Sequence, residues 1–306
     1  GYDMFDCDNG TYDAWYWAHP PVYMPENCNL SEVEHIKNFT SKPVVCAGKM
    51  DPAKAAEEIA AGRLDAVGIA RQNLVDPEWV NKILEDRVED IKPCINCHNA
   101  CFSFNKSKST PNMQPMDDSL HLARCALNPT TMQHNKYKIV PTRHPKKVAI
   151  IGGGPSGMSA AYYLELMGHH AVVFEEKSKL GGMLRYGIPA YRFPRERLQE
   201  DLDAILSTGV EVHLNTRIGN EEGDIPFEKL REEFDAVYIA IGAHTDKKIG
   251  IEGEDSHGVI SAVEMLRNIG EEKMPDFKDK TVVVIGGGNV AMDCTRSSIR
   301  LGAKKV

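Results

Sequence analysis

The sequence lacks any uncharged apolar run that approaches the roughly 18–20 residues a membrane-spanning helix requires. It has no excess of positive charge, since 36 Lys and Arg against 44 Asp and Glu give a net charge of −8. That balance argues against nucleic acid or an anionic membrane as the main partner. Eight cysteines in 306 residues are too few for a disulfide scaffold. The start shows neither an initiator Met nor a basic-then-apolar leader, and we expect no signal peptide.

The composition that is present is ordinary for a soluble globular protein, with 42% hydrophobic and 26% charged residues. A chain of 306 residues predicts about two domains. The pattern along the chain divides it more finely than the length alone does. We expect strand–helix units over 1–90, a cysteine loop over 91–130, a polar linker over 131–145, and glycine-rich dinucleotide turns in 146–245 and 246–306.

Residues 1–90 alternate short apolar runs with helix-start signals. The apolar runs predict strands at Tyr2–Asp6, Pro43–Ala47 and Asp65–Ile69. The helix-start signals are a capping box at 31–34 and Asp-Pro pairs at 51–52 and 76–77. A spacing of about 22 residues between strand starts is typical of βα units in a parallel sheet or a (β/α)8 barrel. Three such units make less than half a barrel, so we expect a segment of a longer polypeptide.

Four of the cysteines form a pattern that indicates an inorganic centre. Cys94, Cys97 and Cys101 are spaced C-x2-C-x3-C, and Cys125 follows 24 residues later. Thiolates are soft ligands that suit iron–sulfur clusters or zinc. Zinc ribbons more often show two C-x2-C pairs, so the tight triplet favours a four-iron cluster, while zinc and free surface thiols remain alternatives. We expect His98 to have a surface or outer-shell role rather than to be a ligand.

A dinucleotide-binding turn follows the apolar strand Lys147–Ile151. The run Gly152-Gly153-Gly154-Pro155-Ser156-Gly157 matches G-x-G-x-x-G, and a helical stretch and a second strand, Ala171–Phe174, come after it. Gly152 permits the tight turn, Gly154 lets a pyrophosphate approach, and Gly157 lets the helix pack close to the strand. Glu175, at the end of the second strand, is placed to accept a hydrogen bond from a ribose hydroxyl.

A second turn of the same kind follows the expected strand Thr281–Ile285, with Gly286, Gly288 and Ala291 at the fingerprint positions. Two such sites predict two different dinucleotides and electron transfer between them. Two further glycines are candidates for the first site. Gly242 ends the expected strand Asp235–Gly242, and Gly182 lies in the glycine-rich segment 180–189, which is either a loop along the cofactor or an ordinary surface loop.

Residues 146–306 resemble the two-dinucleotide flavoproteins, and the runs GGMLRYGIPAYRFPRERL and IGGGNVAMDCTRS are most similar to the glutamate synthase small-subunit group. Residues 1–130 resemble the end of an old-yellow-enzyme barrel with its cluster loop, in the runs YDAWYWAHPP, VVCAGKMDP, AVGIARQNLVDPEW, CINCHNAC and RCALNP. That order of modules resembles the 2,4-dienoyl-CoA reductase and trimethylamine dehydrogenase family of NADH:flavin oxidoreductases.

The resemblance implies an α/β fold: the C-terminal part of a (β/α)8 barrel, a 4Fe–4S cysteine loop and a Rossmann-like two-dinucleotide module, truncated at both ends. It implies FAD on Gly152, Gly154, Gly157 and Glu175, with Gly182 and Gly242 nearby, and NAD(P)H on Gly286, Gly288 and Ala291. It implies FMN in the barrel, its phosphate on Ala47-Gly48-Lys49 and Ala70-Arg71, and a 4Fe–4S cluster on Cys94, Cys97, Cys101 and Cys125. The gap before Cys125 is longer than usual, and Ala70 replaces a usual Gly.

The implied function is electron flow from NAD(P)H to FAD, to the cluster, to FMN and on to an activated C=C bond of an enoate, enone or acyl-CoA. No catalytic acid can be named in these residues. The aromatic run YDAWYWAHPP would face the substrate side, and we expect it to serve loop packing. The alternatives are an electron-transfer flavoprotein like the glutamate synthase small subunit and a zinc-bound, non-enzymatic interaction module. We expect a cytoplasmic protein with a small-molecule substrate, and a homo-oligomer is open.

Overall fold

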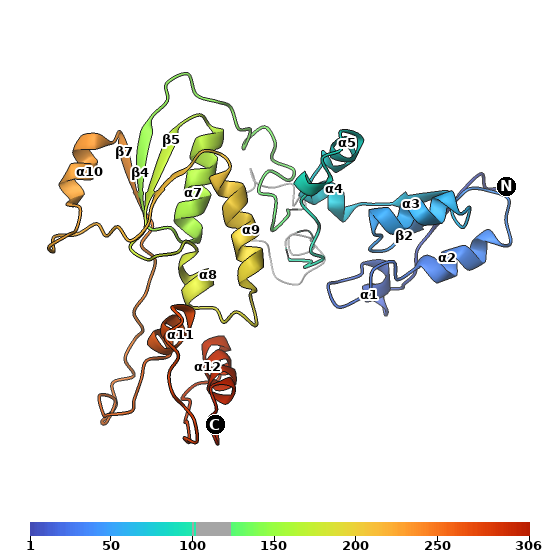
Figure 1. Ribbon diagram of the computed structural model, residues 1–306. Coiled ribbons are helices and arrows are strands. Elements are labelled where there is room, and N and C mark those ends of the chain that lie inside the picture. Colours follow the sequence, from blue (N-terminus) through green and yellow to red (C-terminus); the bar gives the residue numbers. More distant parts are fainter. Residues whose placement is uncertain (100, 102–123) are drawn as a thin grey trace. The chain divides into compact units, whose positions relative to one another are not determined.

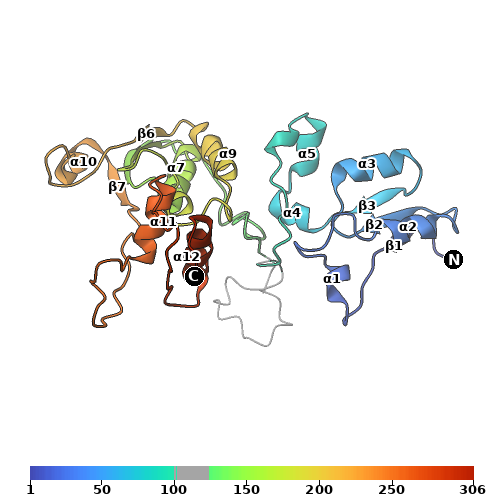
Figure 2. The same ribbon diagram turned by 60° about the horizontal axis from the view of Figure 1, so that its bottom comes forward.

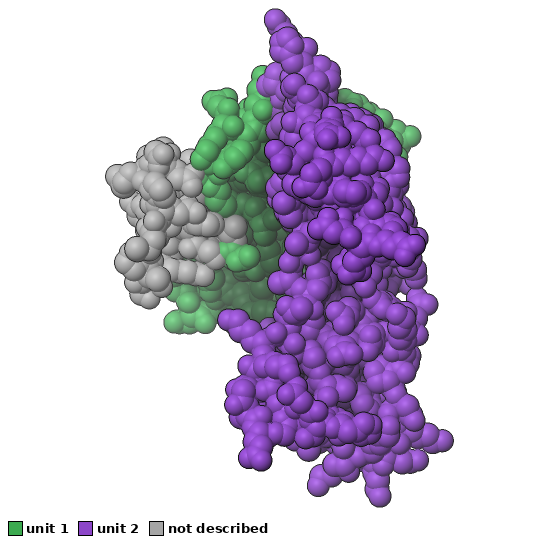
Figure 3. Space-filling model, turned by 90° about the vertical axis from the view of Figure 1, so that its left-hand side faces the viewer, with its two compact units in different colours: residues 1–138 green, residues 139–306 purple. Residues whose placement is uncertain are grey.

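The computed structural model describes residues 1–99, 101 and 124–306. These residues form two compact units, 1–138 and 139–306, which Figure 3 shows in two colours. The division falls inside the polar segment 131–145. Each unit is built on its own parallel sheet. The helices in the described ranges are all too short or too polar to cross a bilayer.

The first unit is a three-stranded parallel sheet with helices between its strands (Figure 1). Its elements are β1 (Phe5–Cys7), α1 (Trp15–Ala18), α2 (Leu30–Lys37), β2 (Val44–Ala47), α3 (Pro52–Ala60), β3 (Ala66–Gly68), α4 (Arg71–Val75), α5 (Trp79–Leu84) and the 3-10 turn η1 (Val88–Asp90). The strand order is β1-β2-β3, and Cys46 pairs with Cys7 on one side and Val67 on the other. Val33, Val44, Cys46 and Leu64 form its buried core. The three expected βα units are therefore present.

Two of the three helix starts differ from the sequence prediction. The Asp51-Pro52 start is confirmed, because Pro52 opens α3 and the Asp51 carboxylate accepts from the Lys54 N–H at 2.8 Å. The capping box at 31–34 is wrong, since α2 begins at Leu30 with Asn29 before it. The Asn29 amide donates to the Ala47 carbonyl at 2.9 Å, so a contact with the sheet fixes this helix end.

The Asp76-Pro77 start is also wrong, because α5 begins at Trp79. Asp76 is instead the residue that ends α4. Its carboxylate accepts from the Lys82 ammonium at 2.6 Å and from the Lys92 N–H at 3.1 Å. Asp76 thus ties α4, α5 and the following segment together, and its other carboxylate oxygen accepts from the Glu78 N–H at 3.2 Å, just before α5 begins.

The second unit is a four-stranded parallel sheet between two helical layers. Its elements are β4 (Lys147–Ile151), α7 (Pro155–Leu166), β5 (His170–Phe174), α8 (Gly182–Tyr186), α9 (Arg195–Leu206), β6 (Glu211–His213), α10 (Phe227–Glu233), β7 (Ala236–Ile239), α11 (Ala262–Gly270) and α12 (Asn289–Arg300). The strand order is β6-β5-β4-β7. The chain runs outward from β4 through β5 to β6 and returns to the other side of β4, which makes the carboxyl end of β4 the point where the strand order reverses.

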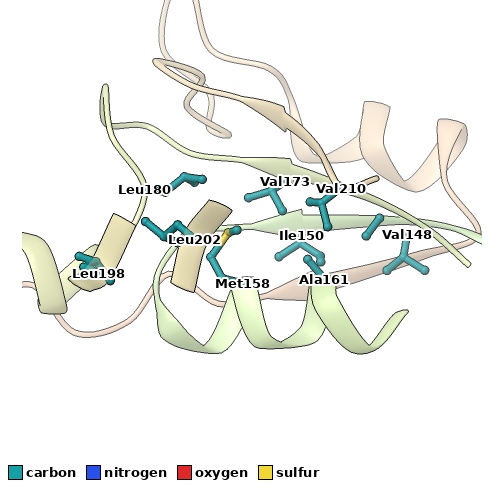
Figure 4. Close-up of a cluster of buried hydrophobic side chains, with 10 residues drawn as sticks. Val148, Ile150, Met158, Ala161, Val173, Leu180, Leu198, Leu202 and Val210 are labelled. Carbon is teal, nitrogen blue, oxygen red and sulfur yellow. The ribbon is translucent and has the colours of Figure 1, made fainter. Parts of the chain in front are cut away.

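Alternation along β4 and β5 sends side chains to opposite faces of this sheet. Val148, Ile150 and Val173 point to the face that α7 and α9 cover, where Met158, Ala161, Leu198 and Leu202 complete the cluster (Figure 4). Ala149 and Val172 point to the other face, where Leu230 of α10 meets them. Strands buried on both faces need continuous apolar runs, which is what the sequence has at 148–151 and 171–174.

The expected strand Thr281–Ile285 is not formed. Only Thr281 makes a strand-like bridge, to Lys305, although helix α12 follows as expected. A strand forms by pairing, and the partner available among the described residues is the short segment Lys304–Val306. Val283 and Ile285 consequently stay 81% and 72% exposed. The segment 180–189 also differs from a simple loop, because α8 occupies its middle.

Candidate functional site

In the glycine turn after β4, two positions require glycine for steric reasons. Gly152 has φ of +107°, and a β-carbon there would lie 2.5 Å from the Ala240 carbonyl oxygen. A β-carbon on Gly157 would lie 1.9 Å from the Gly152 carbonyl oxygen. Gly154 is different, since its nearest neighbour would be the Gly182 α-carbon at 3.6 Å. The protein itself leaves room at Gly154, which is the position where a pyrophosphate approaches the backbone.

Glu175 is buried at the end of β5, and its carboxylate is held by the backbone. One oxygen accepts from the Gly153 N–H at 2.6 Å and the other from the Lys177 N–H at 2.8 Å. The carboxylate therefore braces the glycine turn against the neighbouring strand. A carboxylate oxygen can accept more than one hydrogen bond, so this arrangement leaves acceptor capacity for a ribose hydroxyl.

A cavity of about 750 Å³ opens beside this turn. Of the residues predicted for FAD, it is lined by Gly152, Gly154, Glu175, Gly182 and Gly242. Gly157 is not among the lining residues because it lies buried under the turn, where α7 meets β4. The volume lies within the range typical of cofactor sites, and the residues present fit a dinucleotide whose pyrophosphate meets the N-terminus of α7.

Several lining residues were not predicted from the sequence. They are Glu176, Met183, Tyr186, Thr216, Arg217 and His244. Thr216 and Arg217 come shortly after β6, and the Thr216 N–H donates to the Glu175 carbonyl at 2.8 Å. Ligands of parallel sheets bind at the carboxyl ends of the strands, so the position of Thr216 after a short strand was the signal that could have found it.

The second glycine turn leads directly into α12. Gly286 has φ of +130°, and a β-carbon there would lie 3.5 Å from the β-carbon of Ala291. Ala291 is buried in the first turn of the helix, while Gly287 and Gly288 face open space. Gly288 immediately precedes a 12-residue helix, whose free N–H groups and dipole suit a pyrophosphate.

The four predicted cluster cysteines come together in the first unit. Cys94, Cys97, Cys101 and Cys125 all line one small cavity of about 20 Å³. Burial raises the pKa of the Cys101 thiol, and the nearby Arg71 cation opposes that shift. No group of three or more His, Cys, Asp or Glu side chains within the described ranges is arranged to hold a metal ion, so these thiols would have to rearrange around a cluster. Four soft thiol donors around one cavity match the ligand set of an iron–sulfur centre.

The residues predicted for an FMN phosphate lie at the carboxyl ends of β2 and β3. Gly48 follows β2 with φ of +124°, and the Ala47 carbonyl accepts from the Asn29 amide. The Lys49 ammonium donates to the Met24 carbonyl at 2.7 Å. A glycine turn and a cation at this edge are groups that bind phosphates. In this structure, however, the Lys49 ammonium is hydrogen-bonded to the preceding loop through the Met24 carbonyl.

Arg71 links this edge to the cysteine cavity. It follows Ala70 and opens α4, lines the cavity with the four cysteines, and donates to the Pro20 carbonyl at 2.7 Å. It also contacts the His98 ring nitrogen Nε2. Burial and then the Arg71 cation lower the pKa of His98, which favours a neutral ring that accepts from the guanidinium. His98 is thus a neighbour of the cysteine cavity that contacts Arg71.

The aromatic run at 12–19 does not pack into the interior. Tyr12 is 90% exposed and stacks on Trp15, whose ring also lies 4.6 Å from that of His19. These rings belong to the connection between β1 and α2, which includes α1. Lys49 and Arg71 fix this connection by donating hydrogen bonds to its main-chain carbonyls. Tyr12 therefore packs on Trp15 at the surface and not in the core.

Comparison with known families agrees with both halves of this geometry. The NADH:flavin oxidoreductase / NADH oxidase family matches residues 2–90, and pyridine nucleotide-disulphide oxidoreductase matches residues 146–306. The second match covers 161 of the 306 residues. The chain belongs to the pyridine nucleotide-disulphide oxidoreductase family. Both matched families are oxidoreductases, which disfavours the non-enzymatic alternative, and the two matches imply FMN for the first unit and FAD with NAD(P)H for the second.

Two curated relatives match this chain over different lengths. The cinnamate reductase of Clostridium sporogenes is 32% identical over 301 residues, covering 96% of this chain and 40% of the relative. The glutamate synthase [NADPH] small chain of Escherichia coli (strain K12) is 39% identical over 171 residues, covering 53% of this chain and 36% of the relative. The chain spans about two fifths of the length of these relatives.

A solved structure shares the fold of the whole chain. The 2-naphthoyl-CoA reductase structure superimposes with a TM-score of 0.68 at 24% identity, covering 99% of this chain and 43% of the other. The likeness confirms the expected fold class, a partial barrel followed by a Rossmann-like module.

Proposed function

We propose that this chain is part of an NAD(P)H-dependent oxidoreductase that passes electrons from NAD(P)H to FAD, to a 4Fe–4S cluster, to FMN, and reduces an activated C=C bond. The observation that carries the proposal is the order of the two family matches, with four cysteines lining one cavity between them in the sequence. The cinnamate reductase aligned along 96% of the chain supports an enoate, enone or unsaturated acyl-CoA as the substrate class.

In the second unit, the proposed FAD residues are Gly152, Gly154, Gly157, Glu175, Gly182 and Gly242, and the proposed NAD(P)H residues are Gly286, Gly288 and Ala291. Gly152 and Gly154 present backbone to the pyrophosphate, while Gly157 keeps α7 close enough for its N-terminus to point at it. Glu175 orients the ribose and fixes the turn through the Gly153 N–H. These residues bind and orient, and the bound cofactors supply the hydride and single-electron chemistry.

In the first unit, the proposed cluster ligands are Cys94, Cys97, Cys101 and Cys125, and the proposed FMN phosphate residues are Ala47, Gly48, Ala70 and Arg71. The thiols must lose their protons to bind iron. For Cys101, burial raises the pKa of the thiol, and the Arg71 cation partly offsets that rise. Arg71 would bind the FMN phosphate and would also line the cysteine cavity. The side chain that protonates the substrate is not assigned.

The proposed domain limits are 1–90 for the barrel segment, 91–130 for the cluster loop, 131–145 for the linker, 146–245 for the FAD part and 246–306 for the start of the NAD(P) part. A cytoplasmic location is proposed from the thiol cluster and reduced nicotinamide, which both belong to reducing compartments. A homo-oligomer with a small-molecule substrate completes the proposal.

The test is anaerobic preparation of the holoenzyme, followed by assays for iron, acid-labile sulfide and extracted flavins. We expect iron and sulfide in equal amounts, FAD and FMN together, and NAD(P)H-dependent loss of the C=C absorbance of an aryl enoate or its CoA ester. Zinc without sulfide would rule out the cluster, and a preparation without FMN would rule out the proposed final carrier.

A second candidate is an electron-transfer flavoprotein like the glutamate synthase small chain, which the higher identity over the second unit favours. The barrel match at 2–90 opposes it. This candidate predicts FAD reduction by NAD(P)H with no FMN and no reduction of any C=C substrate, so the same preparation separates the two.

A further inference from the structure

The segment between α8 and α9 is fixed on the FAD side of the second unit. Phe193 packs against the buried cluster beneath α7 and α9. The Arg195 guanidinium donates to the Leu184 carbonyl at 2.9 Å and to the Ile188 carbonyl at 2.7 Å. These contacts hold both ends of the segment, so its middle residues present a defined surface.

Tyr191 and Arg192, in the middle of this segment, hold helix α12. The Arg192 nitrogen Nη1 lies 3.0 Å from each carboxylate oxygen of Asp293. The Tyr191 hydroxyl donates to the main-chain carbonyl of Asp293 at 3.3 Å. One residue of α12 is therefore held through both its side chain and its backbone.

Two arginines of α12 complete this contact. The guanidinium carbons of Arg300 and Arg296 lie 4.0 and 4.8 Å from the centre of the Tyr191 ring. Asp293, Arg296 and Arg300 follow at intervals of three and four residues, which places them on one face of the helix. That face meets the Tyr191 ring and the Arg192 guanidinium over about two helical turns.

The ion pair is unequal in exposure. The Asp293 side chain is 9% exposed and that of Arg192 is 40% exposed. A buried carboxylate without a paired cation is strongly destabilising, whereas an exposed guanidinium can be solvated by water. Loss of the ion pair should therefore destabilise the position of Asp293 more than that of Arg192. Asp293 is the fifth residue of α12, one turn after Gly288, and a shift of its position moves the start of the helix.

Other contacts keep α11 and α12 attached to the FAD side. A β-carbon on Gly270, at the end of α11, would lie 2.7 Å from the Tyr186 α-carbon. The Lys177 ammonium lies 2.9 Å from Glu271, and α11 packs against α12 (Figure 2). Loss of the Arg192 pair alone should therefore change the orientation of α12 without releasing it.

We propose that Tyr191 and Arg192 are positioning residues that set the angle of α12, and with it the dinucleotide turn Gly286–Gly288, relative to the FAD cavity. This inference rests on the proposed function, in which that turn holds NAD(P)H. Its consequence is that Arg192 controls how well the nicotinamide meets the flavin, although Arg192 lines neither the FAD cavity nor the turn.

The experiment compares three variants of the holoenzyme. Arg192→Gln removes the charge, Arg192→Lys keeps it, and Arg197→Gln is the matched control. Arg197 lies on α9 and pairs with Glu200 on the surface, with 72% of its side chain exposed. The two readouts are hydrogen exchange of the α12 amides without nicotinamide, and the rate of flavin reduction at saturating NAD(P)H. The reporter reaction transfers one hydride, with its two electrons, from NAD(P)H to FAD and leaves NAD(P)+.

For Arg192→Gln we expect faster exchange in 289–300, unchanged exchange in β4 and β5, and full FAD content. We expect the saturating rate of flavin reduction to fall about 10- to 100-fold, because small misplacements of reacting groups cost that much. Arg192→Lys should recover most of the rate, and Arg197→Gln should behave as the unaltered protein.

Unaltered exchange and rate in Arg192→Gln would overturn the inference. Loss of FAD in parallel with rate would overturn it as well, since Arg192 would then serve folding of the FAD side. A Lys variant that holds FAD and is as slow as the Gln variant would rule out the ion pair as the cause. Failure of the proposed function looks different, because the unaltered protein would then show no flavin reduction by NAD(P)H.

Discussion

A β-carbon on Gly157 would stand 1.9 Å from the carbonyl oxygen of Gly152, so α7 and the turn before it approach to a distance that only glycine allows. The same turn places Gly154 where a β-carbon meets nothing closer than 3.6 Å. The two glycines of one motif therefore carry different constraints. A β-carbon is excluded by the protein's own backbone at Gly157, whereas at Gly154 the constraint would come from the proposed cofactor.

Gly157→Ala should lower the free energy of unfolding of the second unit by about 1–3 kcal/mol, because α7 must move away from β4. Gly154→Ala should leave the cofactor-free unit as stable as before and reduce FAD content. Urea unfolding and flavin extraction measure the two effects. Gly287→Ala is the control, since its β-carbon would meet no atom within 4 Å. Equal loss of stability in the Gly154 and Gly157 variants would contradict this division.

Replacing Cys101 with Ser should abolish the cluster, because it removes one of four ligands. We expect about four iron and about four sulfide per chain in the unaltered holoenzyme and close to none in the variant. Cys28→Ser is the matched control, since Cys28 contacts Asn29 and the Gly48 carbonyl outside the cysteine cavity. Iron that survives in Cys101→Ser, or is lost in Cys28→Ser, would refute the ligand assignment.

Glu271 should make the second unit sensitive to acid. Hydrogen bonds from Lys273 and Lys177 lower the pKa of Glu271 to about 2 from the ordinary 4.5. A lowered carboxyl pKa in the folded state adds stability that is present above pH 4.5 and is lost as the pH falls from 4.5 to about 2. The amount is on the order of 1–3 kcal/mol.

Glu271→Gln should therefore flatten the decline in unfolding free energy between about pH 5 and about pH 2, measured with urea. Glu272→Gln is the control, because the Glu272 side chain is 75% exposed and its pair with Lys179 lies on the surface. An equal acid dependence in the Glu271 variant and the unaltered protein would show that this carboxylate does not carry the effect.

Arg71→Gln should affect two cofactors at once. The guanidinium lies at the carboxyl end of β3 and also lines the cysteine cavity. We expect about tenfold weaker FMN retention, from loss of a phosphate partner, and a lower reduction potential of the cluster, from loss of a nearby cation. Flavin extraction and a redox titration measure the two. Arg87→Gln, which breaks a surface pair with Glu85 and Asp90, should alter neither.

The sequence predicted those elements whose signals are local. The strand at 147–151, the helix after Gly154 and the start of α3 at Pro52 all formed where propensity, glycine placement and capping agreed. The cysteine spacing was also a local signal, and the four thiols line one cavity. Prediction of these features needed no knowledge of distant residues.

Features set by distant partners could not be predicted in that way. The start of α2 depends on the Asn29 contact with Ala47, eighteen residues away. Among the residues that the structure describes, the strand expected at 281–285 has no paired neighbour beyond the bridge to Lys305. The Arg192–Asp293 pair joins residues 101 positions apart, and nothing in either local sequence announces it.

Gly154 and Gly182 come from separate segments and face each other across the mouth of the FAD cavity, where a β-carbon on Gly182 would lie 2.7 Å from the Gly154 α-carbon. The constraint is one-sided, because a β-carbon on Gly154 would lie 3.6 Å from the Gly182 α-carbon, which is an ordinary contact. In homologous proteins, a larger residue at the position of Gly182 should therefore occur only where the fingerprint turn has shifted, whereas a substitution at the position of Gly154 needs no matching change in the segment that opens α8.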